Sequence, residues 1–254
     1  MEFYSFAVGL DDLVDYQSLY DHHFSGALFA YSPFQEDAFT TIARYANKDY
    51  NLKYIVAVRP YTISAQYLCT INNTLDKIIP NQLQINFVTG WPYEEEKIFG
   101  GILGDVNDSS SNVDRSNYLI KYIDNLNQIK TQKLDYYLSI TNSFIYDLAN
   151  KYNNKMIIPY SYFIDHKFNL LGKDVMISVA PILRQNQEEI NDLNIIKTEQ
   201  DMKAFSYKEF CKVIELLKEN NINKILLRST NTEEKNKIFD FVKKYKEGYF
   251  DGSL

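Results

Sequence analysis

A strand, a helix and a second strand follow one another between residues 54 and 92, and this unit constrains the fold more than any other part of the sequence. The apolar segments 54–58 and 83–89 read as strands, and the residues between them have apolar positions at helical spacing. The first strand stops at a Pro and the second at a Gly-Trp-Pro break. Parallel strands of an α/β fold end at the same edge of the sheet, where such folds place their chemistry. We therefore expect Arg59, Asn86 and Thr89 on one rim.

The rest of the chain repeats this alternation of strands and helices. At 254 residues it has the usual length of one TIM-like barrel, and we predict a single (β/α)8 domain over residues 1–254. Residues 163–174 leave little room for a helix, so that connection is expected to be irregular. The predicted strands are 1–9, 26–33, 54–60, 83–92, 134–140, 155–163, 174–183 and 224–229. The predicted buried helical stripes are Phe39, Ile42, Ala43, Ala46; Leu68, Ile71, Leu75, Ile78; Leu119, Tyr122, Ile123, Leu126; Ile145, Leu148, Ala149, Tyr152; Tyr207, Phe210, Cys211, Ile214, Leu217; and Ile238, Phe241, Val242, Tyr245.

Three further segments have distinct patterns. Residues 93–115 read as a long loop rich in Gly, Asp, Ser and Asn, and such a loop within a compact domain is usually functional or disordered. The stretch that ends at Phe205 is polar and precedes a strongly amphipathic helix. Thr230 and Glu233 have the spacing of a capping box at the start of the last helix.

Charge and termini limit the partners and the compartment. The net charge is −6 and the basic residues are dispersed, which argues against nucleic acid or an anionic membrane as the main partner. The amino terminus lacks the basic region and continuous apolar core of a signal peptide, and no stretch reaches the length of a membrane span. Cys69 and Cys211 lie far apart in predicted helices and are expected to be thiols. We therefore expect a cytoplasmic protein.

Polar side chains gather at the predicted carboxyl ends of the strands, and a closed barrel would bring them to one mouth. Each of them could equally cap a helix or satisfy the loop backbone. The loop from Ser139 to Ser143 runs from a strand into a helix, where backbone N–H groups and the helix dipole favour phosphate, with Arg115 or Arg228 close enough to assist. The candidates at the strand ends are Tyr31, Ser32, Arg59, Asn86, Thr89, Ser139, Thr141, Asn142, Ser143, Arg228 and Ser229.

The sequence contains no recognisable metal or nucleophile motif. His22 and His23 are adjacent, and adjacent residues of a strand point to opposite sides, so they are not expected to share one ion. Zinc motifs, a P-loop, a Gly-x-Gly-x-x-Gly turn and a nucleophile elbow are all missing. We predict no metal site and leave the catalytic residues unassigned.

Residues 24 to about 115 resemble the bacterial luciferase-like, flavin-dependent monooxygenases, and among them the alkanesulfonate monooxygenase branch. Three segments carry the resemblance: Ala57-Val58-Arg59-Pro60, Thr74-Leu75-Asp76 and Ile85-Asn86-Phe87-Val88-Thr89-Gly90. It implies a TIM-like barrel with FMN over its mouth and a homodimer formed through the early helices. It also implies a monooxygenase that receives reduced FMN from a separate reductase and oxidises a small organic substrate with O2.

The same resemblance gives roles to several of the candidate residues. Asn86 and Thr89 match family positions near the flavin ring. The Ser139 to Ser143 loop matches the stretch that holds the phosphate, and Arg115-Ser116 falls where family members carry an Arg-Tyr pair, also near the phosphate.

The chain departs from the family pattern in three places. The Arg-x-His pair of the alkanesulfonate enzymes is replaced by Ile177-Ser178-Val179, which argues against sulfonate cleavage. The segment between Arg184 and Phe205 is too short for the mobile lid of larger relatives. The His22-His23 doublet precedes the second strand, whereas the luciferase doublet ends it, so neither histidine is expected to be needed for chemistry. Two alternatives therefore stay open: a noncatalytic flavin-binding protein or partner subunit, and an oxidoreductase that uses the deazaflavin F420.

Overall fold

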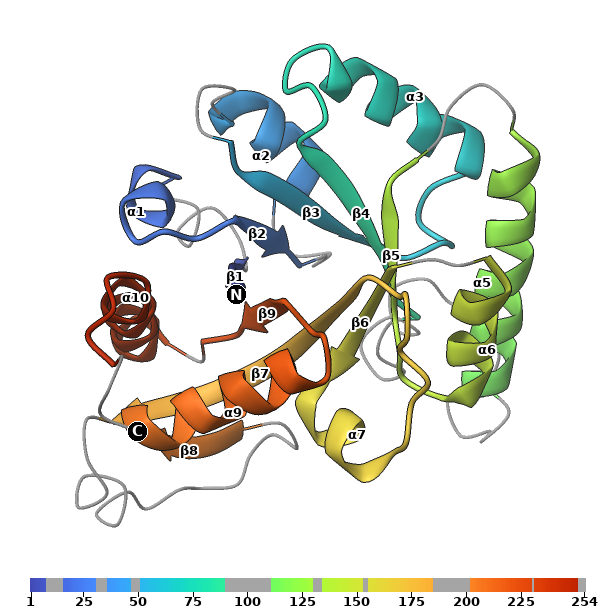
Figure 1. Cartoon of the computed structure of the whole chain (residues 1–254). Coiled ribbons are helices and arrows are strands. Elements are labelled where there is room, and N and C mark those ends of the chain that lie inside the picture. The colour runs from blue at the N-terminus through green and yellow to red at the C-terminus, as the bar shows by residue number, and fades with distance from the viewer. Residues whose placement is uncertain are drawn as a thin grey trace.

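Parallel strands close into a ring in the computed structural model of the chain (Figure 1). The structure describes residues 1–7, 16–30, 36–46, 51–89, 111–129, 134–152, 155–184, 202–229 and 231–250. Each strand of the ring pairs in parallel with the next, and the last pairs with the first, so the sheet is a closed TIM-like barrel and the predicted fold is confirmed. In ring order the strands are β1 (Glu2–Ala7), β2 (Gly26–Phe29), β3 (Lys53–Val58), β4 (Leu83–Phe87), β5 (Tyr136–Ser139), β6 (Lys155–Pro159), β7 (Val175–Arg184) and β9 (Lys224–Leu227).

One additional strand lies outside the ring. β8 (Met202–Ser206) pairs in parallel with the carboxyl half of β7, from Ala180 to Arg184, whereas the amino half of β7 pairs with β6 and β9. Ten residues long, β7 therefore extends beyond the barrel rim. The sequence analysis predicted no strand in the polar stretch that ends at Phe205, so β8 was missed.

The helices lie around the outside of the ring (Figure 1). A side-chain cap marks the start of α2, α3, α9 and α10, with Asp37, Ser64, Ser206 and Asn231 at the four N-cap positions. None of the helices among the described residues is long and apolar enough to cross a membrane. They are α1 (Tyr16–Asp21), α2 (Ala38–Tyr45), α3 (Ala65–Asp76), α5 (Ser111–Gln128), α6 (Ser143–Tyr152), α7 (Tyr160–Asp165), α9 (Tyr207–Glu219) and α10 (Thr232–Lys246).

Most of the predicted helical stripes pack on the barrel. The stripes of α5 and α9 are buried throughout, and those of α6 and α10 are buried except at their last residues. The α2 stripe was partly wrong, because Ala43 is exposed, and in α3 the helix ends at Asp76, which leaves Ile78 outside it and exposed.

Three predicted boundaries are also wrong. α5 begins at Ser111, inside the segment read as loop, because Ser, Asn and Asp favour both loops and first helical turns. β6 ends at Pro159 and the following aromatic residues form α7, a single short helix in the connection expected to be irregular. The N-cap of α10 is Asn231, whose side chain accepts from the Glu234 backbone N–H, so the capping box placed on Thr230 and Glu233 is incorrect.

The barrel interior is layered. At the amino ends of the strands, ionic and amide side chains bond across the ring: Lys224 Nζ contacts both Asp174 carboxylate oxygens at 2.6 and 2.7 Å, Lys155 contacts Asp135 at 2.9 Å, and Gln84 donates to Asp135 at 2.8 Å. An apolar layer lies above them, made of Tyr4, Leu28, Ile55, Ala57, Tyr137, Ile157, Met176 and Leu226. The interior is thus closed at the amino ends of the strands, which leaves the carboxyl ends for a binding site.

Candidate functional site

Asn86 and Ser139 meet on the inner wall of the barrel near its carboxyl mouth. Alternation along β4 and β5 turns both side chains inward, because their neighbours Ile85, Phe87 and Leu138 pack in the outer core. The Ser139 hydroxyl donates to Asn86 Oδ1 at 3.0 Å. Asn86 is 3% exposed and Ser139 is half-buried, so this pair forms a polar step beside Ala57 and Tyr137 of the apolar layer.

Two arginines stand at the same end of the barrel on different walls. Arg59 directly follows β3 and is buried, whereas Arg228 directly follows β9 and is partly exposed. In the ring, β1 and β2 separate these two strands. The hydrogen bonding between β9 and β7 continues through Arg228, whose backbone N–H donates to Val179 O at 2.8 Å. The Thr62 hydroxyl donates to Arg59 O. These two bonds fix the backbone of both arginines at the rim. The expectation that Arg59 and Asn86 lie at one end of the sheet is confirmed.

A second group of predicted residues lies between two helices rather than in the barrel. Asn142 Oδ1 accepts from the Ile145 N–H at the start of α6, and Asn142 Nδ2 donates to Ser116 Oγ on α5 at 3.2 Å. Arg115 and Ser116 are almost fully buried, at 3% and 2% exposure. Asn142 is thus a helix cap and a bridge to α5, so the predicted loop divides: Ser139 faces the barrel interior and Asn142 holds the start of α6.

The remaining predicted site residues are spread along the rim. Thr141 and Ser143 are exposed beside the start of α6, and Thr89 and Ser229 are partly exposed beyond β4 and β9. Tyr31 and Ser32 lie outside the described residues, as does most of the long loop that precedes α5.

The histidine doublet lies before β2, at the opposite end of the barrel from these residues. His22 bonds to the Ser18 carbonyl through Nδ1 at 2.7 Å, and its ring packs against Phe239. His23 is exposed and has a left-handed backbone, with φ of 62°. Both are accounted for by the end of α1 and the turn into β2.

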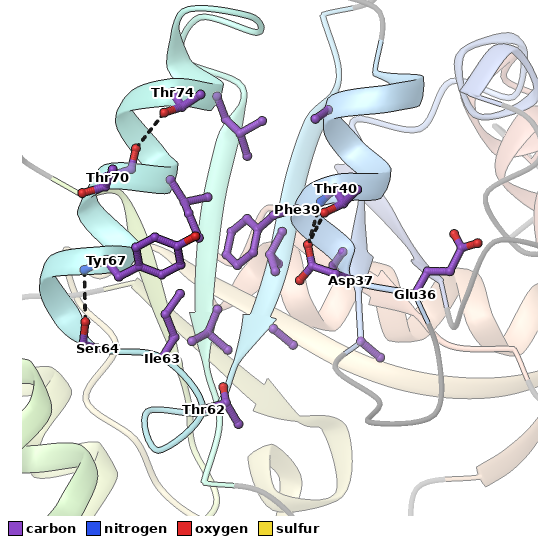
Figure 2. A pocket seen from close by; sticks show the side chains of 18 residues that line it. Glu36, Asp37, Phe39, Thr40, Thr62, Ile63, Ser64, Tyr67, Thr70 and Thr74 are labelled. Atoms are coloured by element: carbon purple, nitrogen blue, oxygen red, sulfur yellow. Dashed lines mark hydrogen bonds between the residues drawn. The ribbon is translucent and has the colours of Figure 1, made fainter.

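A cavity of about 990 Å³ opens elsewhere, on the outer side of β3 between α2 and α3 (Figure 2). Figure 2 shows Phe39 and Tyr67 pointing toward each other across it. Three threonine hydroxyl groups of its lining are engaged within α2 and α3: Thr40 with Asp37, Thr70 with the Gln66 carbonyl and Thr74 with the Thr70 carbonyl. The cavity therefore offers mainly methyl groups and aromatic rings, which suits a packing surface better than a polar ligand.

Two features of the mouth were missed by the sequence interpretation. Ser178 is buried on the inward side of β7, between Met176 and Ala180, and its place in an alternating strand was the available signal. Arg184, the last residue of β7, binds Glu234 of α10 through both guanidinium Nη atoms, at 2.9 and 3.0 Å. No local pattern joins residues fifty positions apart.

Comparison with known proteins supports the fold alone. No protein-family model and no curated protein matches the sequence. Among solved structures, EDTA monooxygenase from Chelativorans sp. BNC1 is 8% identical, with 98% of this chain and 94% of that chain covered and a TM-score of 0.71. This chain and that enzyme share a TIM-like barrel fold.

Two further structures name a cofactor. The oxygenating constituent of 3,6-diketocamphane monooxygenase from Pseudomonas putida, in complex with FMN, is 11% identical over 89% of this chain and 88% of that chain, with a TM-score of 0.58. An F420-dependent secondary alcohol dehydrogenase is 12% identical over 97% of both chains, with a TM-score of 0.65. Structural neighbours of the fold thus include FMN and F420 proteins, and the alkanesulfonate branch is not resolved.

Proposed function

We propose that this chain is a flavin-dependent monooxygenase that binds FMN at the carboxyl mouth of the barrel. The observation that carries the proposal is the Asn86–Ser139 pair, a hydrogen-bonding step set on an apolar layer inside a barrel of the luciferase-like fold. Reduced FMN, supplied by a separate reductase, would provide the electrons that activate O2 for a small organic substrate.

The residues of the chain then have separable tasks. The apolar layer excludes water beneath the ring, and Asn86 and Ser139 orient it. Arg59 and Arg228 place two guanidinium groups at the mouth, on different walls of the barrel. Tyr160, which follows β6, has its phenol pKa raised by burial, and its ring packs against Phe205 in the outer core.

We place the phosphate at the start of α6. Thr141 and Ser143 are exposed there, Arg115 lies on the adjoining helix, and the amino end of a helix favours an anion. Because Asn142 already caps the helix, the test replaces Thr141 and Ser143 together by Ala. Charge-assisted hydrogen bonds are worth roughly 1.5 to 3 kcal/mol, so FMN affinity should fall about tenfold or more, and riboflavin affinity should not. Equal losses for both ligands would remove the phosphate from this loop.

The direct test of the function is a titration of the purified protein with FMN, reduced FMN and F420, followed by absorbance and fluorescence. Tight binding of FMN or reduced FMN, together with oxidation of a small organic substrate that requires this protein as well as the reductase and O2, supports the monooxygenase. Binding without turnover over a panel of small organic substrates supports a noncatalytic flavin protein or partner subunit. Failure of all three ligands to bind refutes a flavin function.

A second candidate is an F420-dependent oxidoreductase. Structural neighbours at a TM-score of 0.65 include an F420-dependent secondary alcohol dehydrogenase and an F420-dependent tetrahydromethanopterin reductase from Methanopyrus kandleri. Selective binding of F420 in the same titration would favour this candidate over FMN.

We also propose a cytoplasmic homodimer formed through α2 and α3. The exposed α3 residues Tyr67, Thr70 and Thr74 lie one turn apart beside the cavity and form a stripe that a second copy could cover (Figure 2). The buried free thiols Cys69 and Cys211 support a reducing compartment. Tyr67→Glu should convert a dimer to a monomer in sedimentation velocity, and a wild-type monomer at micromolar concentration would refute the dimer.

A further inference from the structure

A hydrogen bond joins Ser139 and Asn86 at the floor of the mouth. β4 and β5 pair in parallel, with Asn86 opposite Tyr137, and Ser139 stands one inward position further along β5. Asn86 is 97% buried, so its side chain has little room for other rotamers. In the amide orientation of the structure, the Ser139 hydroxyl donates to Oδ1 at 3.0 Å.

The bond also determines which hydrogen-bonding groups the pair leaves for a ligand. The Ser139 hydroxyl donates its one proton to Asn86 Oδ1, so the lone pairs of the Ser139 oxygen remain as acceptors. The amide Nδ2 of Asn86 carries two N–H donors, and within the described residues the bond to Ser139 is the one recorded for this side chain. A donor and an acceptor thus stand side by side on the inner wall.

We infer that Asn86 and Ser139 together read the pyrimidine edge of the flavin ring, with Asn86 Nδ2 donating to a ring carbonyl and Ser139 Oγ accepting from the N3–H group. This inference rests on the proposed flavin function and assigns Ser139 to the ring rather than to the phosphate. The edge of a flavin alternates carbonyl, N–H and carbonyl, which is complementary to an adjacent donor and acceptor. F420 has the same edge, so the assignment holds for either cofactor.

The inference separates Ser139 from the rest of its loop in a binding experiment. Ser139→Ala removes the acceptor and frees the Asn86 amide to rotate, so riboflavin and FMN should both bind about threefold to tenfold more weakly. Ser139→Thr keeps the hydroxyl and should bind both within about twofold of wild type. A riboflavin methylated at N3 lacks the N–H donor and should bind wild type weakly, with little further loss in Ser139→Ala.

A matched control lies on the same two strands. Gln84 and Asp135 form the equivalent side-chain bond between β4 and β5 at the amino end of the barrel, beneath the apolar layer. Gln84→Met removes that bond without touching the mouth, so it should lower stability and leave the ratio of riboflavin to N3-methylriboflavin affinity unchanged.

Each outcome bears on one proposal. If wild type binds neither flavins nor F420, the proposed function itself fails. If wild type binds flavin but Ser139→Ala loses FMN affinity and not riboflavin affinity, Ser139 belongs to the phosphate and the inference is overturned. Should Ser139→Ala not fold, the wild-type measurement decides alone, because equal affinities for riboflavin and N3-methylriboflavin would also overturn it.

Discussion

Replacing Glu234 by Gln tests whether the end of β7 is held by a desolvated ion pair. Arg184 and Glu234 are 11% and 8% exposed, and both guanidinium Nη atoms face the two carboxylate oxygens. Glu234→Gln keeps the side-chain shape and removes the negative charge. The amide of Gln offers Arg184 one neutral acceptor oxygen in place of the two charged oxygens of the carboxylate, so the positive charge of Arg184 stays buried without its counter-charge. The variant therefore isolates the electrostatic part of the contact.

The expected loss follows from the burial of both partners. Breaking a buried pair by removing one charge typically costs about 3 to 5 kcal/mol. Natural domains have unfolding free energies of roughly 5 to 15 kcal/mol, so the variant should lose a large share of its stability. Urea denaturation followed by circular dichroism should show a much lower midpoint with an unchanged slope, because the surface exposed on unfolding does not change.

The neighbouring residue provides the control. Glu233 pairs with Lys237 at 2.7 Å but lies in solvent, and the hydrogen bond to Lys237 lowers the pKa of its carboxyl. Glu233→Gln should therefore have a far smaller effect at neutral pH, and the contribution of this pair should fade as pH falls through the lowered pKa. Joint replacement, Arg184→Met with Glu234→Leu, should recover stability relative to Glu234→Gln. Equal midpoints for Glu233→Gln and Glu234→Gln would show that the buried pair does not hold β7 to α10.

Three other predictions follow from the core and the barrel ends. Gly26→Ala should prevent folding or cost several kcal/mol by urea denaturation, because an added Cβ would lie 2.1 Å from the Lys53 carbonyl oxygen, a backbone atom that can yield only if β3 moves. Burial raises the pKa of the Tyr4 and Tyr137 phenols, so they ionise first in the unfolded chain; their contribution to stability should be fully present below about pH 10 and be lost above it in pH-dependent melts. His23→Asn, which tolerates the left-handed backbone, should leave flavin affinity unchanged in a fluorescence titration, and a loss would place the doublet at the site.

The barrel was predictable because its strands and helices carry their periodicity locally. The residues around Asn86 alternate between an outer core and the barrel interior, and that alternation stands in the sequence. The buried stripe of α9 from Tyr207 to Leu217 is equally evident in the sequence, because an apolar residue recurs at every third or fourth position. Short-range patterns of this kind are sufficient to order a ring whose neighbouring strands are mostly consecutive in the chain.

The errors arose where a residue type suits two environments. Ala43 fits an apolar stripe, but in the structure it borders the cavity between α2 and α3. Tyr160 to Phe163 has the aromatic content of a strand, yet Pro159 ends β6 and the chain turns into α7. β8 pairs with a neighbour extended beyond the barrel, and nothing within residues 202–206 signals that extension.

The sequence predicted which end of the barrel carries the candidate residues, but it did not predict which of these residues contact one another. The strand ends indicated which end of the barrel carries Arg59, Asn86 and Ser139, because parallel strands share their direction. The partners depend on register and barrel closure: Ser139 and Asn86 are 53 positions apart in the sequence, and Asn142 and Ser116 are 26 apart. The loop from Ser139 to Ser143 therefore resembles a single phosphate motif in the sequence. In the fold, Ser139 belongs to the barrel wall and Asn142 to the start of α6.

The distribution of charge inside the barrel links the fold to the proposed site. Among the described residues, the inward carboxylates Asp135 and Asp174 stand at the amino ends of the strands, where Lys155 and Lys224 pair with them. These pairs are partly exposed and each contributes little on its own, and Glu2, which accepts from the Tyr4 hydroxyl, adds a further carboxylate at the same end. The carboxyl end carries Arg59 and Arg228 on different walls, so the ion pairs and the proposed flavin site lie at opposite ends of the barrel.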